Sequence, residues 1–344
     1  MRGITRRKKK GLAVLAGFLA LTVVFAGCGK KKETPTSRGF KESELFYVED
    51  LSCTRPEAMM FLLSQKSRYE AGYGGAIWDV KVGEQTFEEY MKENLKDFLV
   101  KMKCMTLMAA QYEVELGDED EKRVSQAAAA YLTSLPEETK KETGIDKKTA
   151  EKVFREYYTA SLLVEKLTAD VSMEISEDEA RVITVQQIFL STAGLDAQKK
   201  EERRAEAQNL LARAQAGDDF MVLAKDNNES EIFERELSRG ETDPVFEAAA
   251  FGLGGEEVSP VVETADGFYL IRCVNHYDEE KTAQNKEALG RQHREERFYE
   301  YYDAFVSQVT AACNESAWEE IGYRGSYKQT ETDFYTIYSQ YFPT

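Results

Sequence analysis

The sequence predicts an α+β fold, in which one small mixed domain interrupts a chain that is otherwise mostly helical. A β-rich run at residues 182–190 opens the mixed segment, which continues to about residue 275 as short strands and helices. Glycines such as Gly217 and Gly240 separate its elements. On both sides of this segment, apolar residues recur at helical spacing over long stretches.

The mixed segment is predicted to run in the order strand, helix, helix, strand, helix, strand, strand, with its strands in one four-stranded sheet. The first helix has apolar residues at i, i+3, i+4 and i+7: Ala207, Leu210, Leu211 and Ala214. Gly217 should end this helix, and Asp218 can cap a second, shorter one. The remaining strand, helix and two strands are predicted at residues 231–237, 243–251, 254–264 and 266–272.

The later part of this segment carries short motifs in a particular order: Arg239-Gly240-Glu241, Phe246-Glu247-x-Ala249-x-Phe251, Glu257-Val258-Ser259-x-Val261 and Asp266-Gly267-Phe268. Together with the helix end at Ala224-Lys225, their order and spacing resemble the parvulins, a family of peptidyl-prolyl cis–trans isomerases. The resemblance covers somewhat more than a quarter of the chain and implies an isomerase domain that needs no cofactor. The alternative is an unrelated α+β domain whose Gly and Pro turns are ordinary.

The implied reaction is rotation about an X-Pro amide, which is resisted by about 20 kcal/mol because the C–N bond has partial double-bond character. No covalent step is needed. A catalyst needs an apolar slot for the proline ring, low polarity around the carbonyl and hydrogen bonds that favour the twisted amide. We therefore expect a shallow, partly apolar cup on a small sheet, without a nucleophile.

Carried over position by position, the resemblance assigns catalytic positions to Gln187, Ser230 and Tyr269. It assigns substrate contacts to four more residues: Leu237, Thr242, Phe246 and Thr264. Parvulins usually have histidines at the places of Gln187 and Tyr269 and often a methionine at that of Thr242, and Ser230 is the nearest match to a catalytic Asp or Cys. Gln187 and Tyr269 could still form a neutral hydrogen-bond network. Alternatively, they only fill a repurposed sheet face, and Phe246 is an ordinary contact between helix and sheet.

The amino-terminal residues have the pattern of a secretory signal. Six basic residues precede an apolar run from Gly11 to Ala26, and Ala26-Gly27 stands directly before Cys28. This ending resembles a lipobox, in which Cys28 would receive a lipid and hold the chain on the outer face of a bacterial cell membrane. Phe25 stands where Leu or Val is usual. An uncleaved transmembrane anchor is the alternative, and it would also place the rest of the chain outside.

The charge and the cysteine pattern argue against nucleic-acid binding and against a metal site. The formal net charge is −17, and removal of residues 1–27, with six positive and no negative charges, would take it to −23. Such a surface argues against nucleic-acid binding. No metal site is expected, because the five cysteines show no C-x-x-C spacing and only His276 and His293 accompany them. The four cysteines after Cys28 allow three disulfide pairings, and Cys273 could equally be a buried free thiol.

Helical patterns flank the mixed domain on both sides. Residues 77–83 alternate like a short strand, and Thr86–Glu89 has the form of a capping box before a long helix. Three methionines on that helix are expected in the core rather than in a client groove: Met102, Met105 and Met108. Residues 282–312 should form one further helix. This layout resembles the extracytoplasmic foldases of the PrsA and SurA type, in which the last helix packs on the amino-terminal helices.

These patterns give a domain plan and three open functions. The plan is a signal peptide at 1–27, a tether at 28–44, a helical chaperone lobe at 45–178, the parvulin-like domain at 179–278, a carboxy-terminal helical segment at 279–322 and a Tyr-rich tail at 323–344. We expect a membrane-anchored foldase that isomerises X-Pro bonds in unfolded secreted polypeptides. The alternatives are a degenerate parvulin that only holds clients, favoured by the two replaced histidines, and a surface lipoprotein that is no foldase. The helical flanks disfavour this last alternative, and the sequence does not indicate the clients or the oligomeric state.

Overall fold

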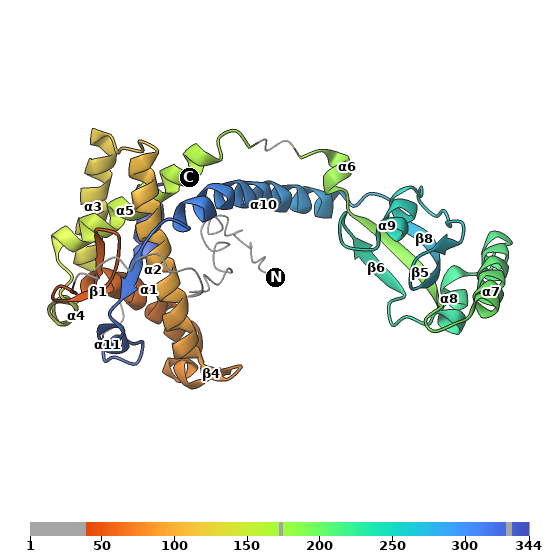
Figure 1. Cartoon of the computed structure of the whole chain (residues 1–344), viewed down its shortest axis with the longest axis horizontal. Coiled ribbons are helices and arrows are strands. Elements are labelled where there is room, and N and C mark those ends of the chain that lie inside the picture. Colours follow the sequence, from red (N-terminus) through yellow and green to blue (C-terminus); the bar gives the residue numbers. More distant parts are fainter. Residues whose placement is uncertain (1–38, 172–174, 328–331, 344) are drawn as a thin grey trace, which may run out of the picture. The chain divides into compact units, whose positions relative to one another are not determined.

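The computed structural model describes residues 39–171, 175–327 and 332–343, so Cys28 and its lipobox-like surroundings lie outside the described residues. The chain divides into two compact units, whose elements are labelled in Figure 1. The helical unit comprises residues up to Ala169 and from Phe298 onward, and the α+β unit comprises Asp170–Arg297. The division falls within helix α10 (Glu279–Val306).

Helices form most of the helical unit. They are α1 (Arg55–Tyr73), α2 (Phe87–Gln111), α3 (Asp118–Ser134), α4 (Glu137–Thr143), α5 (Lys147–Leu167), α11 (Glu315–Glu319), α12 (Phe334–Tyr341) and the short 3-10 helix η2 (Gly75–Asp79). The predicted capping box at the start of α2 is confirmed: the Thr86 hydroxyl accepts from the Glu89 N–H at 3.2 Å, and the Glu89 carboxylate accepts from the Thr86 N–H. Met102, Met105 and Met108 of α2 are buried in the core, as expected.

Two small sheets in this unit were not foreseen in this form. Strands β1 (Glu44–Val48), β2 (Leu51–Thr54) and β9 (Ala311–Cys313) form a sheet in the order β2-β1-β9. The predicted helix over 282–312 therefore ends early, at Val306, and its last residues pair with β1. The predicted strand at 77–83 is also wrong, because Gly75–Asp79 is helical and only Lys81–Val82 (β3) pairs, with Gln85–Thr86 (β4).

The Tyr-rich segment does not form a separate tail. Helix α12 belongs to the core of the helical unit, where Phe334 is fully buried and stacks on Phe154 with ring centroids 4.5 Å apart. Tyr323 is also fully buried and stacks on Trp78 at 4.4 Å. Two aromatic residues of α10, Phe298 and Tyr302, are buried in the same core.

A buried ionic cluster joins α1, α2 and α5. The Lys103 ammonium lies 2.6 Å from the carboxylates of both Glu57 and Glu156, and Lys152 reaches Glu57 at 2.8 Å. Lys103 is only 2% exposed. Burial alone would lower the pKa of Lys103, but the Glu156 and Glu57 carboxylates raise it above its usual value. Each charge in this cluster therefore depends on its partners.

The α+β unit contains one antiparallel sheet in the order β6-β5-β8-β7. Its strands are β5 (Ile183–Ser191), β6 (Glu234–Leu237), β7 (Val262–Glu263) and β8 (Gly267–Asn275), and its helices are α6 (Glu177–Ala180), α7 (Ala197–Gln215), α8 (Phe220–Asn227), α9 (Pro244–Phe251) and the first part of α10. The elements confirm the predicted α+β class and the predicted sequence of strands and helices, but of the strand predicted at 254–264 only Val262–Glu263 forms β7, and Val258 makes an isolated bridge to Arg272. The predicted cap of α8 is off by one residue, since Asp219 accepts from the Val222 N–H while Asp218 pairs with Arg213.

Alternation along the strands gives the sheet two different apolar faces. One face packs on α7 and α8 through Ile188, Leu190, Phe268 and Leu270. The opposite face, which we call the α9 face, packs on Phe246, Ala250 and Phe251 of helix α9. Gly267 is required at the start of β8, because a Cβ atom there would lie 2.2 Å from the Leu190 carbonyl oxygen. This contact explains the glycine of the Asp266-Gly267-Phe268 motif.

The four described cysteines are free thiols: Cys53, Cys104 and Cys273 are buried and Cys313 is half-buried. Of the alternatives for Cys273, the structure therefore has the buried free thiol. Among the helices in the described ranges, none combines the length and the apolar character needed to cross a bilayer.

Candidate functional site

Three of the predicted site residues meet on the α9 face of the sheet. Asp243 caps α9 by accepting from the N–H groups of Val245 and Phe246, and this cap fixes Phe246 in the first turn. The Phe246 ring meets the Tyr269 ring of β8 edge to face, with centroids 5.0 Å apart. Leu237 of β6 belongs to the same apolar cluster. The structure thus brings together an aromatic wall, a phenol and an aliphatic side chain.

Gln187, on the central strand β5, lies on the same face. It is paired with Ile271 across β5 and β8, two residues from the pair of Phe189 and Tyr269. The side chain is 3% exposed, and its amide oxygen is buried without a hydrogen-bond partner within the described residues. A buried polar atom without a partner costs about 1–3 kcal/mol. Such an atom is therefore a candidate for binding a polar group of a ligand.

Two further buried polar atoms beside this cluster also make no hydrogen bond in the described part of the chain. They are Oγ1 of Thr242, directly before the cap of α9, and Nε of Arg235, on strand β6. Arg235 is paired with Val185 and lies two residues from Leu237, so its side chain leaves the sheet on the α9 face. Three unsatisfied polar atoms are therefore available: those of Gln187 and Arg235 on the α9 face, and that of Thr242 in the loop before α9.

Arg235 covers the wall that was expected to be open. Its guanidinium carbon lies 4.6 Å from the centroid of the Phe246 ring. Phe246 is only 2% exposed, since it also packs in the apolar cluster of this face, and the expected shallow cup is not open in this structure. The Arg235 side chain therefore lies on the ring face that a proline was expected to use.

The electrostatics of the cluster keep its phenol neutral. Burial raises the pKa of Tyr269 above its usual value, with Asp266 adding to the rise and Arg235 opposing it. Burial lowers the pKa of Arg235 from its usual value, but a guanidinium is so strongly basic that it stays charged at neutral pH. Beside Phe246, the α9 face thus offers the neutral phenol of Tyr269 and the cation of Arg235 at neutral pH.

Ser230 and Thr264 stand apart from this cluster. The Ser230 hydroxyl accepts from the Ile232 N–H in the loop before β6, and the Thr264 hydroxyl donates to the Gly267 carbonyl in the turn between β7 and β8. Both are thus engaged in local turns, and neither has a described contact with Phe246 or Tyr269. Their assignment to the site remains a prediction from the resemblance.

Sequence reasoning missed two residues that shape the site. Arg235 could have been found from its position two residues before Leu237, because residues at this spacing on a strand point to the same face. Phe189, which stacks on Tyr269 with centroids 4.6 Å apart, also has the parity of Gln187 on β5. Both signals depend on knowing the register of the strands, which motif comparison does not supply.

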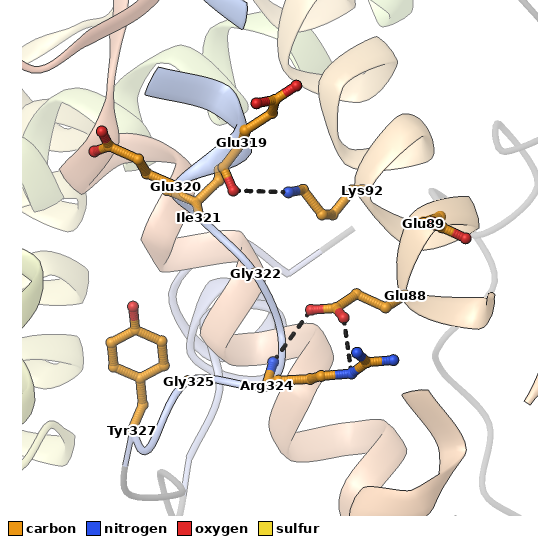
Figure 2. A pocket seen from close by; sticks show the side chains of 10 residues that line it. All are labelled: Glu88, Glu89, Lys92, Glu319, Glu320, Ile321, Gly322, Arg324, Gly325 and Tyr327. Carbon is orange, nitrogen blue, oxygen red and sulfur yellow. Dashed lines mark hydrogen bonds and ion pairs between the residues drawn. The ribbon is translucent and has the colours of Figure 1, made fainter. Parts of the chain in front are cut away.

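Two cavities lie elsewhere in the described parts of the chain. A cavity of about 340 Å³ in the helical unit is lined by residues of α2 and of the segment after α11 (Figure 2). Its polar groups satisfy one another: Glu88 accepts from the Arg324 N–H and pairs with the Arg324 guanidinium at 3.0 Å, and Lys92 donates to the Glu319 carbonyl. A second cavity, of about 400 Å³, lies between β6 and the start of α10 and is bridged by the pair of Lys281 and Glu236. Neither cavity contains a predicted site residue.

Comparisons with known sequences agree with the motifs. The family model of the PPIC-type PPIase domain matches residues 171–277. The foldase protein PrsA of Clostridium botulinum is 24% identical over 340 residues, which cover 91% of this chain and 98% of the relative. PrsA of Caldanaerobacter subterraneus is 24% identical over 287 residues, covering 79% of this chain and 86% of the relative. A crystal structure of PrsA from Bacillus cereus aligns with 74% of this chain and 90% of its own, at 16% identity and a TM-score of 0.35.

The sheet order, the motifs and the match over residues 171–277 lead to one assignment. The match to PrsA sequences extends through both helical flanks, so it is not limited to the isomerase domain. The chain therefore carries a PPIC-type peptidyl-prolyl isomerase domain at residues 171–277, and along most of its length it is similar to PrsA foldases.

Proposed function

We propose that X-Pro bonds of unfolded polypeptides are isomerised on the α9 face, between Phe246 and Tyr269. The observation that carries this proposal is the group of unsatisfied polar atoms there: Gln187 Oε1, Arg235 Nε and Thr242 Oγ1. Leaving three such atoms buried is costly, and a bound peptide would satisfy them with its own N–H and C=O groups. The site therefore has the features of one that is completed by a backbone ligand.

The chemistry follows from the residues without a nucleophile. The Phe246 ring would grip the pyrrolidine ring, and Leu237 would keep water from the amide. A planar amide carries the larger dipole because of its C–N resonance, so an apolar surrounding favours the twisted form. Gln187 Oε1 can accept an N–H of the client, and the Tyr269 hydroxyl can donate to its carbonyl. No step transfers a proton to or from the protein.

The proposed chemistry has a distinctive pH profile. With an Ala-Pro peptide, we expect kcat/KM of the full-length chain to stay constant from about pH 5.5 to pH 8.5, since no histidine with an ordinary pKa of about 6.5 takes part. Because the pKa of Tyr269 is raised, its hydroxyl stays protonated over this whole range. Exchange of the peptide followed by NMR measures the rate. A sigmoid with a midpoint between pH 6 and 7 would show that the reaction uses a titrating group that this proposal omits.

A chaperone without isomerase activity is the second candidate, and the coverage of Phe246 by Arg235 favours it. In that case the proline slot would stay closed, and only the binding of unfolded chains would remain. Measuring proline exchange and the aggregation of an unfolded client with the same preparation separates the two. Suppressed aggregation without faster exchange would assign the chain to this second candidate.

We further propose that the protein works outside the cytoplasm, held on the membrane by a lipid on Cys28. The support is the order of basic residues, apolar run and small residues before this cysteine. A single lipid chain binds membranes only marginally, so two or more chains at Cys28 would be needed for stable anchoring.

The anchor has a direct test. After expression in a bacterium, we expect Cys28→Ser to move the chain from the membrane fraction to the soluble extracytoplasmic fraction or to leave it unprocessed. Thr36→Ala serves as the matched control, since it changes a nearby polar residue and leaves the cysteine in place. Mass spectrometry of the mature amino terminus would reveal the lipid, and an unmodified Cys28 in the membrane fraction would contradict the anchor.

A further inference from the structure

Arg235 differs from the other arginines around the site in having no ionic partner. Arg239 pairs with Asp178 at 2.7 Å and Arg272 pairs with Glu256. Arg235 makes no ion pair or hydrogen bond within the described residues, and its Nε is buried. Within the described residues, its guanidinium makes a cation–π contact with the Phe246 ring, 4.6 Å from the centroid. A half-buried guanidinium with free donors is an unsatisfied cation.

The carboxylates near Arg235 are occupied elsewhere. Glu234 and Glu236 precede and follow it on β6, and strand alternation directs them to the opposite face. There Glu234 accepts from the Gln186 amide at 2.8 Å, and Glu236 pairs with Lys281. The charge of Glu241, on the loop before α9, acts to raise the pKa of Arg235, but Glu241 makes no described ion pair with it and accepts from the Ser238 N–H at 3.0 Å. The fold therefore leaves Arg235 available for an anion that comes from outside.

We propose that Arg235 is a specificity-determining residue, which makes the isomerase site prefer prolines that have an acidic residue directly beside them. This inference rests on the proposed function of the α9 face. A proline ring against Phe246 would place the neighbouring residue within 3.8 Å of the proline Cα, so that its side chain reaches a guanidinium beside the same ring. A carboxylate there would receive two parallel N–H donors, which is the geometry that arginine supplies best.

The position of Arg235 over Phe246 also favours clients that have an acidic residue. The guanidinium must leave the ring before proline can enter, and every client therefore loses the same cation–π contact. A client with an acidic neighbour returns a charge-assisted contact to the displaced guanidinium. A client with an uncharged neighbour leaves it without a partner, so the acidic client is expected to bind better.

The negative net charge of the protein opposes the binding of acidic peptides, so a measured preference for them cannot come from the overall charge. With a net charge of −17, the surface repels acidic peptides at long range. A preference for acidic clients must therefore come from a local cation. Salt screens the long-range repulsion more than the contact with a half-buried guanidinium, so raising the ionic strength should not remove the preference.

The experiment compares peptides that differ only in one charge. For the full-length chain, kcat/KM would be measured by NMR exchange for Ala-Glu-Pro against Ala-Gln-Pro and for Ala-Pro-Glu against Ala-Pro-Gln. We expect about a 10-fold preference for glutamate on one side of the proline, because a bidentate charge-assisted contact replaces a neutral one. Arg235→Gln should bring this ratio to about one, and Arg235→Lys should keep part of it, since an ammonium cannot form the planar pair.

Arg204→Gln is the matched control. Arg204 also lies over an aromatic ring, 5.0 Å from the centroid of Phe268, but on the opposite face of the sheet and paired with Glu263 at 2.7 Å. Its removal changes the net charge equally and should leave the glutamate preference unchanged. A wild-type ratio near one, or a ratio that survives Arg235→Gln, would overturn the proposal.

Peptide binding can test the role of Arg235 even if the protein does not catalyse proline exchange. Should none of the four peptides exchange faster, the proposed isomerase function fails, and the binding of the same peptides, measured by NMR titration, decides the role of Arg235. Tighter binding of the glutamate peptides by the wild type than by Arg235→Gln would support it. Equal binding by both proteins would refute it.

Discussion

Replacing Gln187 with methionine should stabilise the α+β unit and at the same time lower prolyl isomerisation. The Gln187 amide oxygen is buried without a partner, so an apolar side chain of similar shape removes a penalty of about 1–3 kcal/mol. If this oxygen binds the client in the twisted state, its loss should cost about 100-fold in kcat/KM. A gain in stability together with a loss in rate distinguishes a functional residue from a structural one.

Gln186→Met is the matched control for this change. Gln186 is the next residue on β5, but it faces the other way and its amide is satisfied, donating to Glu234 at 2.8 Å and accepting from Arg272 at 3.1 Å. This variant should lose stability and keep its rate. Hydrogen exchange over residues 183–275 reports the stability of this unit. A destabilised Gln187→Met variant with an unchanged rate would show that the amide is only structural.

Replacing Lys103 with methionine should destabilise the helical unit by about 3–5 kcal/mol. The substitution leaves Glu57 and Glu156 buried and facing each other without the ammonium that lies 2.6 Å from each. Denaturant unfolding followed by tryptophan fluorescence isolates this effect, because both tryptophans of the chain, Trp78 and Trp318, are buried in the helical unit.

Lys122→Met provides the comparison, since its pair with Glu119 is largely exposed and should contribute at most about 1 kcal/mol. Adding Glu156→Leu to Lys103→Met should recover part of the lost stability by removing one uncompensated charge. If Lys103→Met unfolds at the same denaturant concentration as Lys122→Met, the buried cluster does not hold the three helices together.

The sequence predicted most of the α+β unit because its signals are local. The β-rich composition of residues 182–190 gave β5, turn residues gave the element boundaries, and Asp243-Pro244 gave the start of α9. The motif glycine Gly267 has a local steric reason in the Leu190 carbonyl. The resemblance placed these strands in one four-stranded sheet, whereas their order in the sheet, β6-β5-β8-β7, is known only from the structure.

The features that the sequence did not predict have a common physical cause: each depends on contacts with residues that are distant in the sequence. Strand β9 forms because β1, more than 260 residues earlier, offers its edge at Phe46, which pairs with Cys313. Phe334 and Tyr323 are core residues because α1, α2 and α5 leave room for them. The position of Arg235 over Phe246 likewise depends on how β6 and α9 meet, and neither segment indicates this alone.

The central claim is that an X-Pro peptide binds the α9 face of the sheet, and methyl NMR of the full-length chain tests it most directly. On addition of an Ala-Pro peptide, we expect shifts for the methyl groups of Val185, Leu237, Val262 and Ile271, which line that face. Ile188, Leu190 and Leu223 lie on the other face and should not shift. Shifts confined to that other face or to the helical unit, or no shifts in the α+β unit at saturating peptide, would contradict the site proposed here.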